Sequence, residues 1–143
     1  MDQEWKFSHV GMVVRDLKKT VATLQALGII SVPDTEPAVL QGKAPDRTDG
    51  TGTILRLDVT CGDLCIELLQ PISGDNIQQR WLNAHGEGIS HVCFDVPDIA
   101  AARSRMAAQG VPVLCHIRES TTYYDTGKPG HLQIELTQTT GAI

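Results

Sequence analysis

The chain has 143 residues, of which 41% are hydrophobic and 20% charged, and its formal net charge is −5. This composition is that of an ordinary globular protein, and the length fits one domain of roughly 100 to 200 residues. The acidic balance and the scattered Lys and Arg residues argue against nucleic acid and membrane surfaces, so we expect a small-molecule substrate. No apolar run is long enough to span a membrane and the start is too polar for a signal peptide, so we expect a cytoplasmic protein.

In the first half, the run HVGMVV predicts a strand, and Asp16 follows it as the expected N-cap of a helix. Gly28 then predicts the end of that helix. Three further strands are expected around 29–33, 53–60 and 63–70. Residues 33–52 are polar and have no counterpart in the second half, which indicates a functional lid or a disordered excursion.

The second half shows the same order of elements after a linker at 71–88, in which we expect a short helix around 75–84. HVCFDV predicts a strand, Asp98 a helix N-cap and Gly110 the end of that helix. Three more strands are expected around 111–117, 120–126 and 131–138. Each half therefore predicts a βαβββ unit, and the chain an α+β fold.

An internal repeat supports this division. Residues 7–29 align without a gap on residues 89–111, and LCIELLQ at 64–70 matches LQIELTQ at 132–138. Self-similarity of this kind indicates a duplicated structural unit. We therefore expect one domain, residues 1–143, made of two modules, which span 7–70 and 89–138.

Two histidines and two glutamates occupy repeat-equivalent positions. Alternation in the IEL strands turns Glu67 and Glu135 away from the helices, where a buried carboxylate is costly unless it is paired or binds a cation. A single strand His or Glu is more often structural, but this set occurs twice in the same order. We therefore expect one metal shell of His9, Glu67, His91 and Glu135, with Zn, Ni, Co, Mn and Fe(II) all possible.

Three other residues are candidates for substrate binding. Arg56 should face the same side of the sheet as the glutamates, where it would bind a substrate carboxylate or pair with Asp58. Tyr123 and Tyr124 point to opposite faces of an extended segment, so one can contact substrate while the other packs in the core.

The paired βαβββ halves, with SHVGMVV and SHVCFDV opening strands and two IEL strands, resemble the vicinal oxygen chelate superfamily over nearly the whole chain. The stretch IELLQPISGDNIQQRWLNAHGEGISHVCFDVPDI resembles the methylmalonyl-CoA epimerase branch. The resemblance implies a cupped, mostly antiparallel sheet around a metal site. It also implies a homodimer, and ligands at His9, Glu67, His91 and Glu135.

The same resemblance implies an epimerase or isomerase in which a divalent metal stabilises the enolate of a small acyl or carbonyl substrate. Glu135 or Glu67 would then move the proton. Arg56 departs from the pattern, because some epimerases carry a catalytic glutamate near that position. Two alternatives stay open: a glyoxalase I-like lyase, which uses the same ligand set, and a non-enzymatic resistance protein that binds a small molecule in the same cup.

Overall fold

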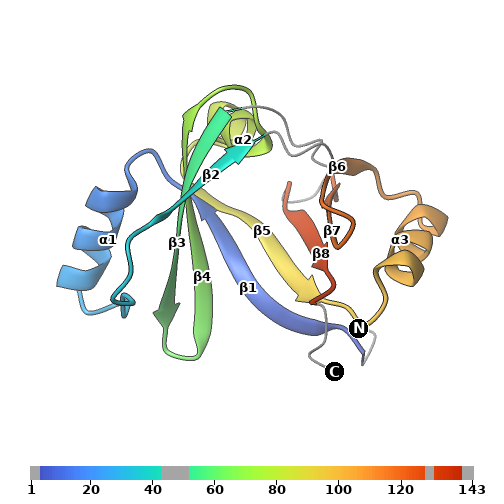
Figure 1. The fold of residues 1–143 in the computed structure, drawn as a ribbon, viewed down its shortest axis with the longest axis horizontal. Helices are drawn as coiled ribbons and strands as arrows, with labels where there is room; N and C mark the ends of the chain where they lie inside the picture. The colour runs from blue at the N-terminus through green and yellow to red at the C-terminus, as the bar shows by residue number, and fades with distance from the viewer. Residues whose placement is uncertain (1–3, 43–51, 128–130, 140–143) are drawn as a thin grey trace.

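The computed structural model describes residues 4–42, 52–127 and 131–139, which form one curled sheet with three helices (Figure 1). The strands are β1 Lys6–Val13, β2 Ala38–Gly42, β3 Gly52–Cys61, β4 Leu64–Ser73, β5 Gly88–Asp95, β6 Val113–Ile117, β7 Thr121–Asp125 and β8 Gln133–Thr137. The helices are α1 Leu17–Ala26, α2 Ile77–His85 and α3 Ile99–Ala108. None of these helices is long and apolar enough to cross a bilayer.

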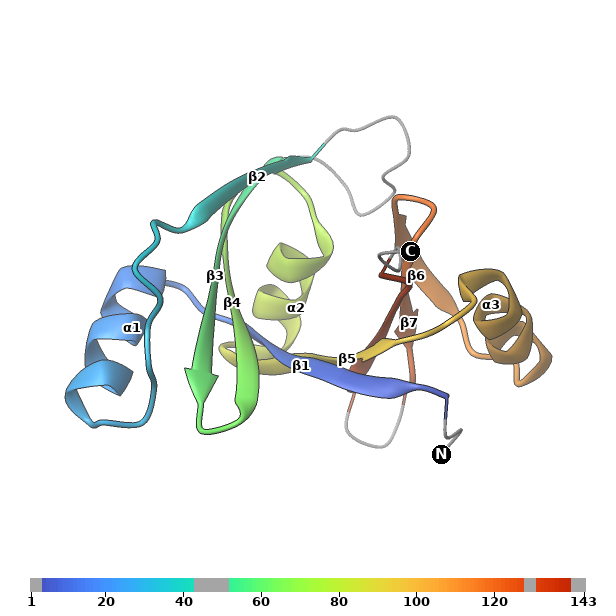
Figure 2. The ribbon, with the colours of Figure 1, turned by 60° about the horizontal axis from the view of Figure 1, so that its bottom comes forward.

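The strand order is symmetric about the centre of the sheet. It runs β2-β3-β4-β1-β5-β8-β7-β6, so that β1 and β5 lie together in the middle. The pairs β1–β4 and β5–β8 are parallel, and the other neighbours are antiparallel. The two sides rise from β1 and β5 like the walls of a cup (Figure 2). The predicted α+β fold with a cupped, mostly antiparallel sheet is confirmed, while the assignment of two modules to one domain stays a prediction.

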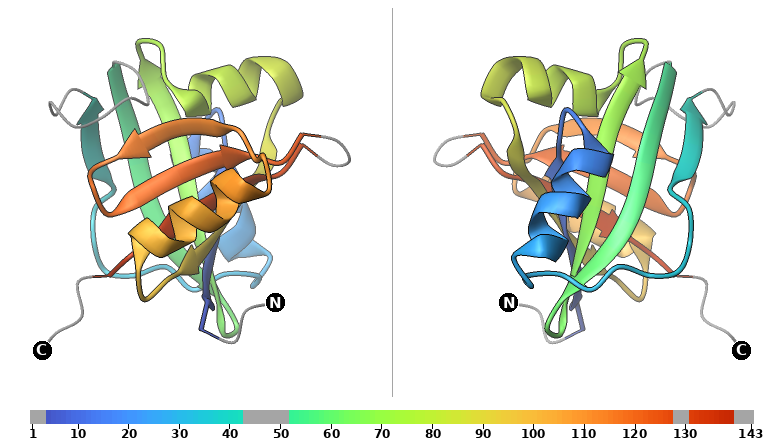
Figure 3. Two further views of the ribbon diagram at one scale, coloured as in Figure 1. Left: turned by 90° about the vertical axis from the view of Figure 1, so that its right-hand side faces the viewer. Right: turned by 90° about the vertical axis from the view of Figure 1, so that its left-hand side faces the viewer.

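Helices α1 and α3 begin and end as the sequence predicts. The carboxylates of Asp16 and Asp98 each accept a hydrogen bond from the backbone N–H three residues later, at 2.9 and 3.0 Å. Gly28 and Gly110 follow the two helices with φ of +70° and +69°, a conformation that glycine adopts without steric cost. The two helices lie on the outer surface of the cup, on opposite sides, and α2 lies at one end (Figure 3).

Each outer helix covers a separate apolar core. On one side Leu17 of α1 packs in a cluster with Val59 and Leu68 of the sheet. On the other side Ala102 of α3 packs with Leu136. The apolar residues of the two IEL strands therefore face the helices, which leaves the opposite faces of β4 and β8 for the interior of the cup.

The edge of the first half differs from the prediction. The prediction of a strand around 29–33 is wrong. The described structure has no strand in that segment, where Ser31 forms an isolated bridge to Thr60. Pro33 and the turn residues after it end the extended segment. The edge strand is instead β2, which lies inside the predicted loop 33–52 and pairs with β3. Residues 43–51 of that loop lie outside the described residues.

We expect Leu136→Ala to lower the free energy of unfolding by about 2–5 kcal/mol, because the fully buried side chain would leave a cavity beneath α3. Urea denaturation followed by circular dichroism measures this. Leu27→Ala, at a side chain that is 67% exposed, is the control and should change stability by less than about 0.5 kcal/mol. Equal small losses for both variants would contradict this description of the core.

Candidate metal centre

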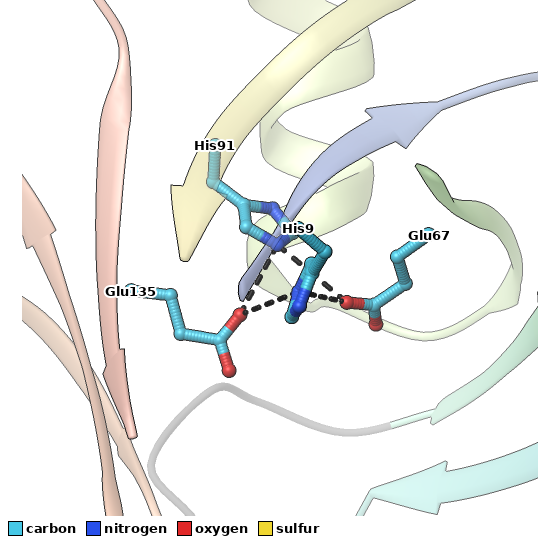
Figure 4. A group of neighbouring side chains, drawn as sticks. All are labelled: His9, Glu67, His91 and Glu135. Atoms are coloured by element: carbon cyan, nitrogen blue, oxygen red, sulfur yellow. Dashed lines mark ion pairs between the residues drawn. The ribbon is translucent and has the colours of Figure 1, made fainter. Parts of the chain in front are cut away.

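Four side chains from distant parts of the chain meet inside the cup (Figure 4). They are His9 on β1, Glu67 on β4, His91 on β5 and Glu135 on β8. One potential ligand atom from each lies within 4.8 Å of the others. The structure thus brings the four predicted ligands together, and the cluster is of a kind that can hold a metal ion.

Strand register explains why these four residues meet. The strands β4, β1, β5 and β8 are neighbours at the centre of the sheet, and each supplies one ligand. In the central pair, His9 lies opposite Cys93 and Gly11 lies opposite His91. Since Gly11 and Cys93 are themselves repeat-equivalent, the sheet sets the two histidines in matching positions on the two strands.

The ligand atoms are spaced as neighbours around a common centre. The Nε2 atom of His9 lies 2.6 Å from Oε2 of Glu67 and 3.5 Å from Oε2 of Glu135. The Nε2 atom of His91 lies 3.1 Å from Oε2 of Glu135 and 3.6 Å from Oε2 of Glu67. Ligands about 2.1 Å from a metal ion lie at comparable separations from one another.

The hydrogen bonds of the two imidazoles favour a cation at this point. Ser8 Oγ lies 2.9 Å from Nδ1 of His9, and Ser90 Oγ lies 3.2 Å from Nδ1 of His91. Both Nε2 atoms are buried and lack a hydrogen-bond partner of acceptable geometry. Metal-bound histidines usually donate their other ring N–H to such a partner, which fixes the ring and aims its lone pair at the ion. The residues present therefore fit a divalent transition metal.

The electrostatics of the cluster require positive charge. Burial opposes ionisation of His9, but contacts with Cys93, Glu135 and Glu67 outweigh it and raise the pKa of His9 to about 12. Contacts with both glutamates likewise raise the pKa of His91 against the effect of burial. Burial would raise the pKa of Glu135, yet its contacts with the histidines lower it to about 2. Two imidazole protons or one divalent cation can balance the two carboxylates.

Gly11 provides the space for His91. A Cβ atom built at Gly11 would lie 1.8 Å from Cε1 of the His91 ring. No other residue type leaves room for the imidazole in this rotamer. We did not single out this residue in the sequence, although a glycine inside a predicted strand indicates a close approach of another group.

Three members of the cluster, His9, Glu67 and Glu135, line a cavity of about 640 Å³, a size typical of sites for small molecules. Arg56 also lines it and donates to Asp58 from Nε (3.1 Å) and Nη2 (2.9 Å). Its Nε atom lies 3.4 Å from Oε1 of Glu67. The pairing of Arg56 with Asp58 is thus observed, while its binding of a substrate carboxylate stays a prediction.

Tyr123 and Tyr124 face opposite sides of the sheet, as the alternation of side chains along a strand predicts. The hydroxyl of Tyr123 lines the cavity and donates to Oε2 of Glu135 at 2.7 Å. Tyr124 is 1% exposed and packs against Leu136 in the core beneath α3. Tyr124 is thus not brought to the cavity, and its assignment to substrate binding is corrected: the neighbouring residue in a strand faces the other side of the sheet.

Comparison with known proteins agrees with this geometry. The family described as the glyoxalase/bleomycin resistance protein/dioxygenase superfamily matches residues 8–126. The chain belongs to this superfamily, which confirms the resemblance seen in the sequence. An ethylmalonyl-CoA/methylmalonyl-CoA epimerase of Cereibacter sphaeroides is 34% identical over 95 residues, which cover 59% of this chain and 69% of the relative.

Solved structures share the fold at low sequence identity. A hypothetical protein of Bacillus halodurans C-125 matches with a TM-score of 0.68 and 18% identity, over 99% of both chains. Methylmalonyl-CoA epimerase from Mycobacterium tuberculosis matches with a TM-score of 0.68 and 19% identity, over 95% of this chain and 89% of that one. A variant of the Streptomyces coelicolor methylmalonyl-CoA epimerase, in complex with 2-nitronate-propionyl-CoA, has a TM-score of 0.64 and 21% identity over 95% and 98%.

We expect Gly11→Ala to displace the His91 ring, to weaken metal binding by at least about tenfold and to cost about 1–3 kcal/mol of stability. Ni²⁺ titration calorimetry and thermal denaturation measure the two effects. Asp63→Asn, in the exposed turn between β3 and β4, is the control and should retain both metal affinity and stability. In a His91→Ala background, Gly11→Ala should carry no stability cost, and a cost that persists there would contradict the proposed clash.

We expect the metal-free protein to release protons when a divalent cation binds near pH 7, because the raised histidine pKa values favour protonated imidazoles and the cation displaces their protons. Metal affinity should therefore rise with pH through this range. Titration calorimetry in buffers of different ionisation enthalpy counts the protons. His9→Gln should reduce the number of protons released, and binding without proton release would rule out this charge balance.

Proposed function

We propose that this protein is a divalent-metal-dependent epimerase that acts on a small acyl or carbonyl substrate, in the manner of methylmalonyl-CoA epimerase. The observation that carries the proposal is the cluster of two histidines and two glutamates, three of which line a cavity large enough for a substrate. The 34% identity to a curated epimerase supports the choice of reaction.

The four clustered side chains, His9, Glu67, His91 and Glu135, would hold the cation. Bound there, a divalent cation supplies a Lewis acid that polarises a substrate carbonyl and makes the neighbouring C–H bond more acidic. The chain supplies the groups that take up and return the proton, and these must lie within hydrogen-bond reach of the reacting carbon.

Glu135 is the stronger candidate for the base that removes the proton. Its Oε2 atom faces the histidines and accepts from Tyr123, while none of the described residues forms a hydrogen bond or ion pair with its Oε1. In Glu67 both oxygens have neighbours, since Oε1 lies 3.4 Å from Arg56 and Oε2 lies 2.6 Å from His9. The adjacent guanidinium lowers the basicity of Glu67.

Tyr123 and Arg56 would orient the reacting groups. Tyr123 is 4% exposed, and its hydrogen bond fixes the carboxylate of Glu135 in the cavity wall. Arg56 is fixed by Asp58 and presents its guanidinium edge to the cavity, where a substrate oxygen can accept from it. Return of the proton to the opposite side of the same carbon gives epimerisation.

The test is proton–deuterium exchange at the α carbon of methylmalonyl-CoA in D₂O with added Co²⁺ or Ni²⁺. We expect exchange that requires the metal, and a fall of at least about 100-fold in Glu135→Gln. Asp63→Asn, at an exposed turn between β3 and β4, is the control and should exchange at the wild-type rate.

Other outcomes point to other members of the superfamily. Turnover of a hemithioacetal without exchange in acyl-CoA substrates would support a glyoxalase I-like lyase. Ligand binding that is indifferent to chelator, with no exchange in any compound, would support a non-enzymatic binding protein. Either result would refute the proposed epimerase.

A further inference from the structure

Arg118 lies in the tight turn between β6 and β7 and lines the same cavity as the metal cluster. Its φ is +63°, in the left-handed region that favours glycine. A residue with a side chain costs about 1 kcal/mol or more in this conformation. The turn thus bears a local cost that glycine would avoid, and it places an exposed arginine in the lining of the cavity.

The charges on the described part of the cavity wall leave Arg118 uncompensated. The acidic groups there are Asp58, Glu67 and Glu135, and the arginines are Arg56 and Arg118. Arg56 is paired with Asp58, and a divalent cation would balance the two glutamates. No hydrogen bond or ion pair joins the Arg118 side chain to another described residue. A metal-loaded cavity therefore carries one excess positive charge on this wall, which favours an anionic ligand.

Strand geometry places Arg118 away from the reacting end of the substrate. Tyr123 lies beside Glu135, and Thr121 precedes it by two residues in β7, a distance of about 7 Å along the strand. Arg118 lies beyond Thr121, in the turn before β7 begins. A ligand that extends from the metal cluster toward this turn would therefore come within reach of Arg118.

We propose that Arg118 binds an anionic oxygen group, a carboxylate or a phosphate, on the portion of the substrate distant from the metal cluster, and that this contact selects the substrate. The planar guanidinium suits both anions, because it donates two parallel hydrogen bonds. The anion would belong either to the acyl group or to a phosphorylated carrier. The inference rests on the proposed function for the position of the reacting carbonyl.

The test uses binding to the Ni²⁺-loaded protein, measured by titration calorimetry. One set of probes is the dicarboxylates from malonate to adipate, each compared with the monocarboxylate of equal chain length. The second set is coenzyme A compared with pantetheine, which lacks the phosphates. We expect the wild-type protein to prefer the more anionic member in at least one set by about tenfold or more.

Arg118→Gly should abolish that preference while leaving the less anionic probe bound as before. Because glycine relieves the positive φ, this variant should fold with an unchanged or higher Tm. Arg118→Lys should keep most of the preference, since it keeps the charge. Arg80→Gln is the control, because Arg80 pairs with Asp75 outside the cavity lining, and it should bind every probe as the wild type does.

Each outcome decides the proposal. Loss confined to the dicarboxylates supports an anion on the acyl group, and loss confined to coenzyme A supports a phosphorylated carrier. A wild-type protein without preference, or an Arg118→Gly variant that retains it, overturns the inference. These binding measurements do not depend on turnover. A failed α-carbon exchange assay would therefore refute the proposed epimerase without deciding whether Arg118 binds an anion.

Discussion

Two carboxylates lie almost out of contact with solvent in the middle of this molecule, and their charge must be balanced. Glu67 and Glu135 are 6% and 8% exposed. Isolated buried carboxylates would be protonated or would destabilise the fold, because the interior solvates charge poorly. The imidazoles of His9 and His91 lie against them and balance their charge when protonated. A bound divalent cation would balance the same charge. The arrangement of the four central strands follows from this requirement, since each strand supplies one member of the cluster.

The cluster of two histidines and two glutamates could be predicted because its members occur twice. A lone His in a strand carries little information, but the repeated order of His9 and Glu67, then His91 and Glu135, indicates a common site from the sequence alone. Helix ends were also accessible, because N-cap aspartates and terminal glycines act through local hydrogen bonds and backbone conformation. These features depend on neighbours in the sequence or on comparison of the chain with itself.

What could not be predicted depends on contacts across the sheet. The edge strand β2 was not predicted, because five residues between polar segments give a weak local pattern. The segment is a strand because it pairs with β3. The role of Gly11 depends on the register of β1 against β5, which no single segment reveals. The separation of Tyr123 from Tyr124 followed from alternation, but which of them faces the cavity required the register of β7 against β8.

The two halves supply matching ligands, yet the neighbours of these ligands differ. Asp58 is paired across the sheet with Glu67, while Tyr123 is paired with Glu135. A cage with true twofold symmetry would accept a chelating molecule in two equivalent orientations. Here one flank is an arginine–aspartate pair and the other a phenol, so those orientations differ in energy. Under the proposed epimerase function, the two epimers of a substrate with one stereogenic carbon would meet different surroundings. The turnover numbers of the forward and reverse reactions would then be free to differ, while the equilibrium constant is fixed by the substrates alone.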